Sequence, residues 1–209
     1  MSKSLCVILQ CFIGFSRVTS AQDVAFRTWF DLPETVLAGH TIQVWLWASF
    51  EVDNVPAADG WFNGLYGSIE VSGDLAAFSS ISEVQDGLSV WLSPGTPDGP
   101  WLRDVFVIQV YGWPGIEFDD RNPLPVLMFE VATTPETTGN LQVDLRPPSD
   151  RTSPLLTWRD DDGIDWVDSD GPGVGLTASS GLVRVIPTPS CVGLLASAAL
   201  AARRRRTRP

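Results

Sequence analysis

The sequence predicts an all-β protein built on a single antiparallel β-sandwich. Between residues 22 and 185, apolar residues recur at every second position and show no sustained period of 3.6 residues. Clusters of Gly, Pro, Asp and Asn separate these alternating runs. The chain has 209 residues, of which 44% are hydrophobic, and this is enough to fill one core. Many short strands with frequent turns favour a sandwich.

Eight segments are predicted to be strands. The clearest is 41–50, in which alternate residues from Ile42 to Phe50 form one apolar face. The other predicted strands are 24–30, 65–71, 88–92, 105–111, 126–132, 141–145 and 182–186. Turn residues are concentrated at 93–100, 112–115 and 134–139.

Residues 1–21 have the three zones of a secretory signal peptide. Lys3 gives a positive start, 5–15 is an apolar run, and small residues lead to an expected cleavage after Ser20 or Ala21. The apolar run is shorter than the roughly 20 residues that a membrane span needs. We therefore expect a removable export signal, in preference to an N-terminal helix buried in the domain.

Residues 186–209 combine a proline pair, an apolar run and an arginine cluster. As a helix, 186–202 would be roughly 25 Å long, which is the lower limit for crossing a membrane. The arginines that follow would stay on the cytoplasmic side. The alternative is a disordered basic tail after an ordinary C-terminal helix. A surface helix should be amphipathic, however, and 192–202 has no polar face.

This C-terminal order resembles the PEP-CTERM sorting signal of bacterial proteins that exosortases process. The residues that carry the resemblance are Pro187, Thr188, Pro189, Arg203, Arg204, Arg205 and Arg206. Thr188 stands where the family usually has an acid. The resemblance implies export, transient anchoring in the inner membrane by a short C-terminal transmembrane helix, and cleavage near the proline motif. It also implies a signal peptidase and an exosortase-type enzyme as processing partners, and a final location on the cell surface or outside the cell.

Two segments of the middle resemble cohesin-like sandwiches of secreted bacterial proteins. One is Pro33-x-x-Val36-x-x-Gly39-x-x-Ile42-x-Val44, a turn that leads into an alternating strand. The other is 126–131 followed by 139–145, with the glycine-bounded segment 64–71 between the two. The resemblance implies a cohesin-like fold, with a jelly-roll as the alternative sandwich, and bears on the fold more than on dockerin binding. The expected organisation is a signal peptide at 1–21, a sandwich at 22–185 and a sorting signal at 186–209.

The charge of the middle restricts its partners. Residues 22–185 hold seven arginines, no lysine and all 25 acids, a net charge of −18. Such a surface repels phosphate backbones, which excludes nucleic-acid binding. We expect contact with the membrane only through the C-terminal helix.

The middle also lacks the usual catalytic side chains. All three cysteines, Cys6, Cys11 and Cys191, lie in the terminal segments, and His40 is the only histidine of the chain. Hydrolysis at neutral pH generally needs a tuned base, an activated nucleophile or a metal-bound water. The sequence therefore predicts a protein that is not an enzyme. A glycosidase made from two carboxylates is the remaining enzymatic alternative.

An acidic repeat at 159–171 suggests calcium as the one cofactor that the chain could bind. Asp160-x-Asp162-Gly163 and Asp168-x-Asp170-Gly171 repeat eight residues apart. Alternate aspartates before a glycine place several carboxylate oxygens around one turn, which suits a hard cation. Neither copy is a complete EF-hand loop. The alternative is a solvated acidic loop that binds no metal.

Two tryptophans form a candidate carbohydrate-binding pair. Trp45 and Trp47 lie on the face opposite the apolar stripe of 41–50, roughly 7 Å apart on one side of a sheet. Tryptophan is amphipathic enough to be half exposed and can stack on a sugar ring. The alternative is that both faces of this strand are covered, as in a fully buried strand.

We therefore expect an exported, non-enzymatic envelope or matrix protein that acts in adhesion or surface assembly, with other envelope proteins as partners. The competing hypothesis is a carbohydrate-binding module, with or without calcium, that recognises exopolysaccharide.

Overall fold

The computed structural model describes residues 24–52, 60–73, 76–82, 90–109, 119–160 and 166–188. These ranges contain the strands β1 (Val24–Asp31), β2 (Thr35–Leu37), β3 (Thr41–Val52), β4 (Gly60–Ser72), β5 (Ala76–Ser82), β6 (Val90–Ser93), β7 (Thr96–Asp98), β8 (Trp101–Gln109), β9 (Leu124–Thr133), β10 (Gly139–Arg146), β11 (Leu155–Asp160), β12 (Trp166–Asp168), β13 (Gly175–Ala178) and β14 (Gly181–Ile186). Within them, no helix is long and apolar enough to cross a membrane.

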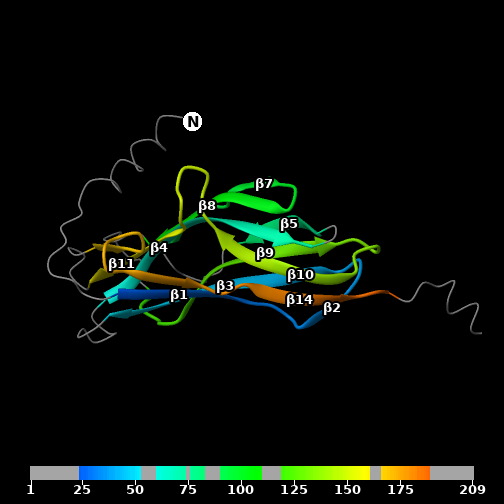
Figure 1. Cartoon of the computed structure of the whole chain (residues 1–209), viewed down its shortest axis with the longest axis horizontal. Coiled ribbons are helices and arrows are strands. Elements are labelled where there is room, and N and C mark those ends of the chain that lie inside the picture. Colours follow the sequence, from blue (N-terminus) through cyan, green and yellow to red (C-terminus); the bar gives the residue numbers. More distant parts are fainter. Residues whose placement is uncertain are drawn as a thin grey trace, which may run out of the picture.

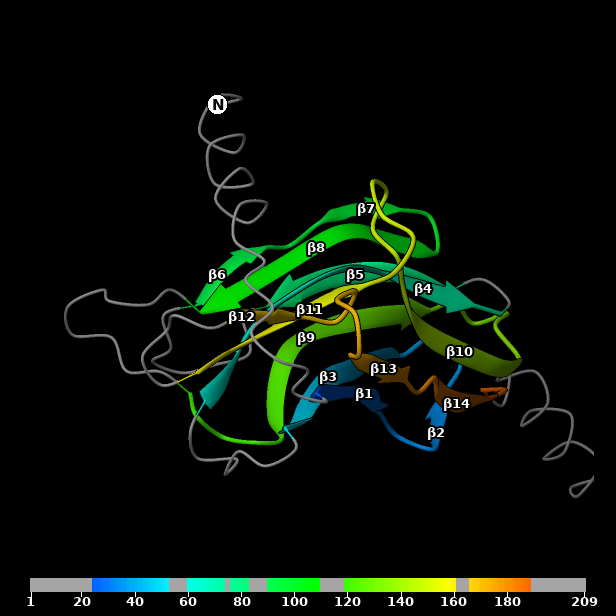
Figure 2. The ribbon, with the colours of Figure 1, turned by 60° about the vertical axis from the view of Figure 1, so that its left-hand side comes forward.

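The strands form two sheets that pack face to face, so the predicted all-β sandwich is confirmed (Figures 1 and 2). The five-stranded sheet has the order β13-β1-β3-β9-β5. The nine-stranded sheet has the order β12-β11-β4-β10-β14-β2, and β8 lies on the free side of β4 with β6 and β7 beyond it. β1 begins near one end of the long axis of the molecule and β14 finishes near the other (Figure 1).

The core follows from the alternation along each strand. In β3 the stripe from Ile42 to Phe50 is buried, while the residues between point to the outer face of the sheet. β1 and β10 contribute in the same way, and Trp158 of β11 packs against Phe50 with ring centroids 6.1 Å apart. In β9 a register shift opposite Leu46 and Trp47 leaves Val126 and Leu127 both buried. The aliphatic and aromatic side chains of both sheets thus fill a single core.

The strands predicted from alternation are observed, with shifted ends. β1, β3, β9, β10 and β14 match the predicted segments to within two residues, and β4 contains 65–71. The predicted segments 88–92 and 105–111 overlap β6 and β8. Residues 88–89 and 110–111 of these predicted segments lie outside the described residues. β8 begins at Trp101, directly after the predicted turn at 93–100 and before the predicted strand start at 105.

Five short strands and β5 were not predicted. β2, β7, β12 and β13 have three or four residues each, too few for an alternating pattern, and β11 directly precedes the acidic repeat. β7 lies inside the predicted turn at 93–100. The expectation of a purely antiparallel sandwich was wrong in two places, because β1 pairs with β13 in parallel and β14 pairs with β2 in parallel.

The close approach of β4 and β8 generates a stability prediction. A Cβ atom on Gly64 would lie 2.7 Å from the carbonyl oxygen of Val107, closer than real Cβ contacts. We expect Gly64→Ala to lower the free energy of unfolding by about 2 kcal/mol, because two paired strands must separate to admit the methyl group. Urea denaturation of the full chain measures this change.

Gly175→Ala is the matched control, since a Cβ atom there meets nothing within 4 Å. We expect its free energy of unfolding to stay within about 0.5 kcal/mol of the wild type. Equal losses for the two variants would contradict the packing argument.

Candidate functional site

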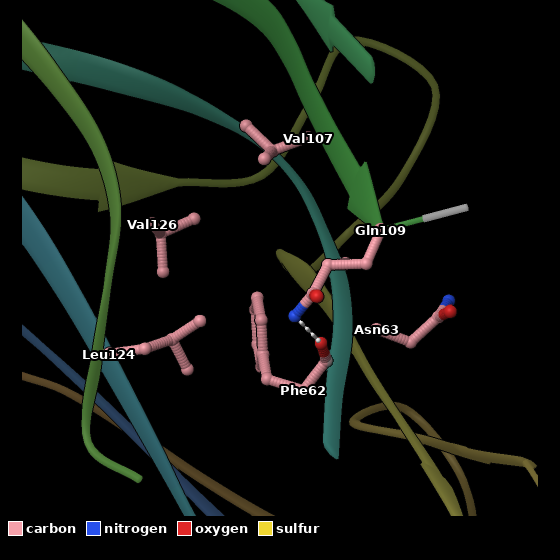
Figure 3. Close-up of a pocket in the computed structure, with 7 residues that line it drawn as sticks. Phe62, Asn63, Val107, Gln109, Leu124 and Val126 are labelled. Atoms are coloured by element: carbon pink, nitrogen blue, oxygen red, sulfur yellow. Dashed lines mark hydrogen bonds between the residues drawn. The ribbon is translucent and has the colours of Figure 1, made fainter. Parts of the chain in front are cut away.

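The pocket that the described residues form between the sheets is small. A void of about 10 Å³ lies between the sheets and is lined by Phe62, Asn63, Gly64, Val107, Gln109, Leu124 and Val126 (Figure 3). A void of this size holds one water molecule at most. The Gln109 side-chain amide donates to the Phe62 carbonyl at 2.7 Å and to the Asp119 carbonyl at 3.1 Å, whereas the Oδ1 atom of Asn63 is buried without a hydrogen-bond partner. Gln109 therefore closes this end of the core and offers no free group to a substrate.

The outer face of the five-stranded sheet carries an aromatic cluster. Trp45 and Trp47 both point outward from β3 and are half-buried. The antiparallel register places Trp29 of β1 opposite Trp47, and their rings are stacked with centroids 6.3 Å apart and planes 11° from parallel. Met128 of β9 lies opposite Trp45 on the other side. We call Trp29, Trp45, Trp47 and Met128 the aromatic platform.

Polar groups border the aromatic platform. Asp31 is the cross-strand neighbour of Trp45, and an exposed ion pair joins Arg27 to Glu51 at 3.4 Å. The indole nitrogen of Trp47 is buried and has no hydrogen-bond partner in the structure. Flat apolar rings with flanking carboxylates are suited to contact with a surface or a sugar ring. Trp29 was not predicted as part of the pair, although its outward position in the alternation of 24–30 was readable.

The acidic repeat is only partly described. Asp160 ends β11 and Asp168 ends β12, two strands that pair with each other, whereas Asp162 and the side chain of Asp160 lie outside the described part. Asp170 is paired with Arg151 at 2.9 Å. In the ranges that the structure covers, no three His, Cys, Asp or Glu side chains are grouped to hold a metal ion. The calcium site stays a prediction.

Asp168, the last residue of β12, is partly buried, unlike a carboxylate in a solvated loop. One of its carboxylate oxygens is buried without a hydrogen-bond partner. Burial raises the pKa of Asp168 to about 6, the neighbouring charge of Asp170 contributes to the rise, and Arg151 opposes the shift. The adjacent Ser169 fixes this turn, because its hydroxyl accepts from the Leu156 amide at 2.9 Å and donates to the Pro154 carbonyl at 3.1 Å.

A second cluster lies on the outer face of the nine-stranded sheet and was not predicted from the sequence. Tyr66 of β4 and Phe106 of β8 form an edge-to-face pair with centroids 6.1 Å apart. Asp104 has a φ of 58° and is held by Ser149, whose amide and hydroxyl donate to its carboxylate at 2.7 and 2.9 Å. The pKa of Tyr66 is raised, first by burial and then by its hydrogen bond to Asp150. Segment 147–154 is thereby tied down across this sheet.

The proline motif begins inside the folded body. β14 includes Ile186, one residue beyond the expected sandwich limit of 185, and the hydroxyl of Thr188 donates to the Ala38 carbonyl at 2.6 Å. His40 is exposed, and its Nδ1 lies 3.4 Å from the same carbonyl. Pro187 is exposed, whereas Pro189 and Arg203–Arg206 lie outside the described residues.

Comparison with known proteins gives a likeness of fold. No protein-family model matches the chain, and no curated protein matches it. Among solved structures, the sixth cohesin of scaffoldin B from Acetivibrio cellulolyticus, in complex with a dockerin, matches with 9% identity, 78% of this chain, 99% of that chain and a TM-score of 0.50. A cohesin module of a family 33 glycoside hydrolase from Clostridium perfringens matches with 15% identity, 77% and 96% coverage and a TM-score of 0.48. A cohesin–dockerin complex from Clostridium thermocellum matches with 12% identity, 82% and 98% coverage and a TM-score of 0.48. The Acetivibrio match supports a cohesin-like β-sandwich, and the resemblance to cohesin-like sandwiches is confirmed at the level of the fold.

The raised pKa of Asp168 predicts a pH-dependent cost to stability. The pKa of this carboxyl group is higher in the folded state than in the unfolded state. The free energy of unfolding of the protein therefore falls as pH rises between the two values, here from 3.8 to about 6. We expect Asp168→Asn to unfold like the wild type near pH 4. At pH 7.5 it should be more stable by about 1 kcal/mol, a value discounted for partial exposure to solvent. Urea denaturation at the two pH values measures the difference.

The exposed Asp31→Asn is the control for a general relief of negative charge, and it should show no gain of this kind. Equal gains for both variants would mean that net charge, and not the burial of Asp168, sets the pH dependence.

The same unfolding series with millimolar calcium against a chelator tests the predicted calcium site, because a cation that binds only the folded state stabilises it. A midpoint that calcium does not move would leave a solvated acidic loop.

Proposed function

We propose that this chain is an exported, non-enzymatic protein of the cell envelope that acts in adhesion or surface assembly through contacts made by its sheet faces. The observation that carries the proposal is that the aromatic platform is turned outward, while the described residues enclose only a small pocket between the sheets. Binding groups presented on a flat sheet suit a macromolecular surface better than a small substrate, which requires a concave site. The Acetivibrio cohesin of similar fold is in complex with a dockerin, which supports a protein as the partner of the present chain.

Delivery rests on the two terminal segments. Residues 1–21 would direct export, and the PEP-CTERM-type segment would anchor the chain in the inner membrane until an exosortase-type enzyme cut near Pro187–Pro189. The Thr188–Ala38 hydrogen bond supports placing the end of the sandwich at Thr188, so that the free sorting segment would begin at Pro189. The mature protein would then be released to the cell surface or the surroundings.

We expect the mature protein from its native host to start near Gln22 and to end near the proline motif. Mass spectrometry of the intact protein in the extracellular fraction measures both ends. Recovery of Arg203–Arg206 in that fraction would contradict the sorting proposal. Retention of 1–21 would contradict the proposed signal peptide.

A carbohydrate-binding module is the second candidate, and the stacking of Trp29 on Trp47 favours it. Parallel indole rings extend the apolar surface beyond the Trp45–Trp47 pair, and a longer aromatic surface can contact more than one sugar ring. Under this alternative the ligand would be the exopolysaccharide of the host, with or without calcium.

A retention experiment separates the two candidates. The full chain is incubated with the exopolysaccharide of the host and, separately, with its envelope proteins freed of polysaccharide. We expect retention by the protein fraction that disappears after protease treatment of that fraction, and loss of retention in Trp47→Ala. Trp101→Ala is the control, because Trp101 lies on the nine-stranded sheet beneath Arg103.

Retention by the polysaccharide alone, lost in Trp45→Ala or Trp47→Ala, would establish the carbohydrate-binding alternative instead. Shortening of the polysaccharide that one Asp or Glu substitution abolishes would contradict a non-enzymatic role. Retention by neither fraction would contradict surface assembly.

A further inference from the structure

The exposed large apolar side chains of the described residues are gathered in one place. They are Leu37 of β2 and Leu182 and Ile186 of β14, with 43%, 60% and 40% of their surface exposed. β2 and β14 are neighbours in the nine-stranded sheet, and Leu37 is the direct partner of Ile186. Grouped exposed apolar residues indicate contact with another apolar phase or surface.

The strand segments that form this area hold no acidic residue. Arg184 lies between Leu182 and Ile186, and Asn140 and Gln142 of β10 lie opposite Arg184 and Leu182. We call the outward side chains of Leu37, Asn140, Gln142, Leu182, Arg184 and Ile186 the β14 face. Segments 35–40, 139–143 and 181–188 hold no Asp or Glu, although residues 22–185 contain 25 acids.

The nearest acids, Asp144 and the exposed Glu34, lie at the border of this face. Asp144, the next outward residue of β10, is 7% exposed and is paired with Arg146 at 3.2 Å. Glu34 precedes β2 at the margin of the sheet and accepts the Arg184 amide through its backbone carbonyl at 2.9 Å. The β14 face therefore presents aliphatic side chains and one cation, a combination that suits lipid headgroup phosphates above an apolar layer.

The connection to the C-terminal segment limits where this face can be. The hydrogen bond of Thr188 to Ala38 holds the chain against the sandwich, and the apolar run begins at Val192. Three residues, 189–191, span at most about 10 Å when extended. Because β14 includes Ile186, the expected helix cannot begin at that residue, and 189–202 as a helix would be only roughly 21 Å long. When so short a segment is inserted in a bilayer, the end of β14 must lie at the headgroup layer.

We infer that the β14 face is a bilayer-contact surface, on which the folded sandwich lies against the phospholipid headgroups while its tail is inserted. The inference rests on the tail anchoring proposed above. It extends membrane contact beyond the C-terminal helix. This is possible because the acids that give residues 22–185 their net charge of −18 lie outside the three segments of this face. It also specifies an orientation: in a molecule standing on its tip, Leu182 would be about 13 Å farther from the bilayer than Ile186.

The test measures the depth of labelled positions in vesicles. The full chain, with Cys6, Cys11 and Cys191 replaced by Ser, receives one cysteine at a time for a polarity-sensitive fluorophore: Leu182→Cys, Ile186→Cys or Thr177→Cys. Thr177 is the control, because it is exposed on β13 of the other sheet. The labelled chains are reconstituted in phosphatidylcholine vesicles that contain lipids brominated along the acyl chains.

We expect loss of emission by bromine quenching at positions 182 and 186 and none at 177. Quenching at 186 alone would show a molecule that stands on its tip and would overturn the inference. Emission already shifted to the blue without vesicles would show that protein covers the face, and it would overturn the inference as well. If the chain does not float with vesicles, tail anchoring fails together with the inference. Flotation without quenching at 182 removes the inference alone.

A charge substitution provides an independent check. The label is placed at Thr35→Cys, which lies on the same side of the sheet beside Arg184. The double substitution Leu182→Asp and Ile186→Asp should abolish quenching of this label, while the chain still floats with the vesicles through its tail. Cooperative urea unfolding confirms that the double variant is folded. Unchanged quenching at position 35 would overturn the inference.

Discussion

The architecture depends on β4, whose two edges pair with three strands. One edge pairs with β8, and the other pairs first with β11 and then with β10. This sharing is possible because the chain leaves β10 at Arg146 and returns as β11 beside the same strand, with 147–154 projecting from the sheet between them. Gly67 lies at this junction, where a Cβ atom would be 3.0 Å from Leu145 and 3.3 Å from the Arg146 carbonyl. A side chain there would require Leu145 and the Arg146 carbonyl at the end of β10 to shift.

Prediction from the sequence succeeded where a strand is long and has one buried face. In β1 and β3, alternation predicted both the strand and its inner residues, and the outward positions of Trp45 and Trp47 followed from it, whereas β9 buries the consecutive Val126 and Leu127. The stacking of Trp29 on Trp47 depends on the register between β1 and β3, which no local pattern encodes. Likewise, the raised pKa of Asp168 arises from burial beside β11, whereas the sequence shows only a polar repeat.

The outer faces of the two sheets differ in chemistry. The five-stranded sheet carries the aromatic platform, which Asp31 and the Arg27–Glu51 ion pair border. On the nine-stranded sheet, Arg146 pairs with both Glu70 and Asp144, Ser149 donates to Asp104, and Asp150 is hydrogen-bonded to Tyr66. Exposed ion pairs of this kind add little stability, so the second face is better suited to electrostatic selection of a partner than to holding the sandwich together. Two faces of such different chemistry are suited to contact with two different components.

The position of β14 also constrains when the protein can fold. This strand lies between β10 and β2, so its partners come from the middle of the chain and from its first quarter. Pairings between such distant segments form slowly, because a large loop must close before any contact is gained. The sandwich therefore cannot be completed until Ile186 is available, only a few residues ahead of the apolar run. Under the proposed export, a chain that crosses the membrane residue by residue would remain unfolded, and fit for translocation, until its last part arrives.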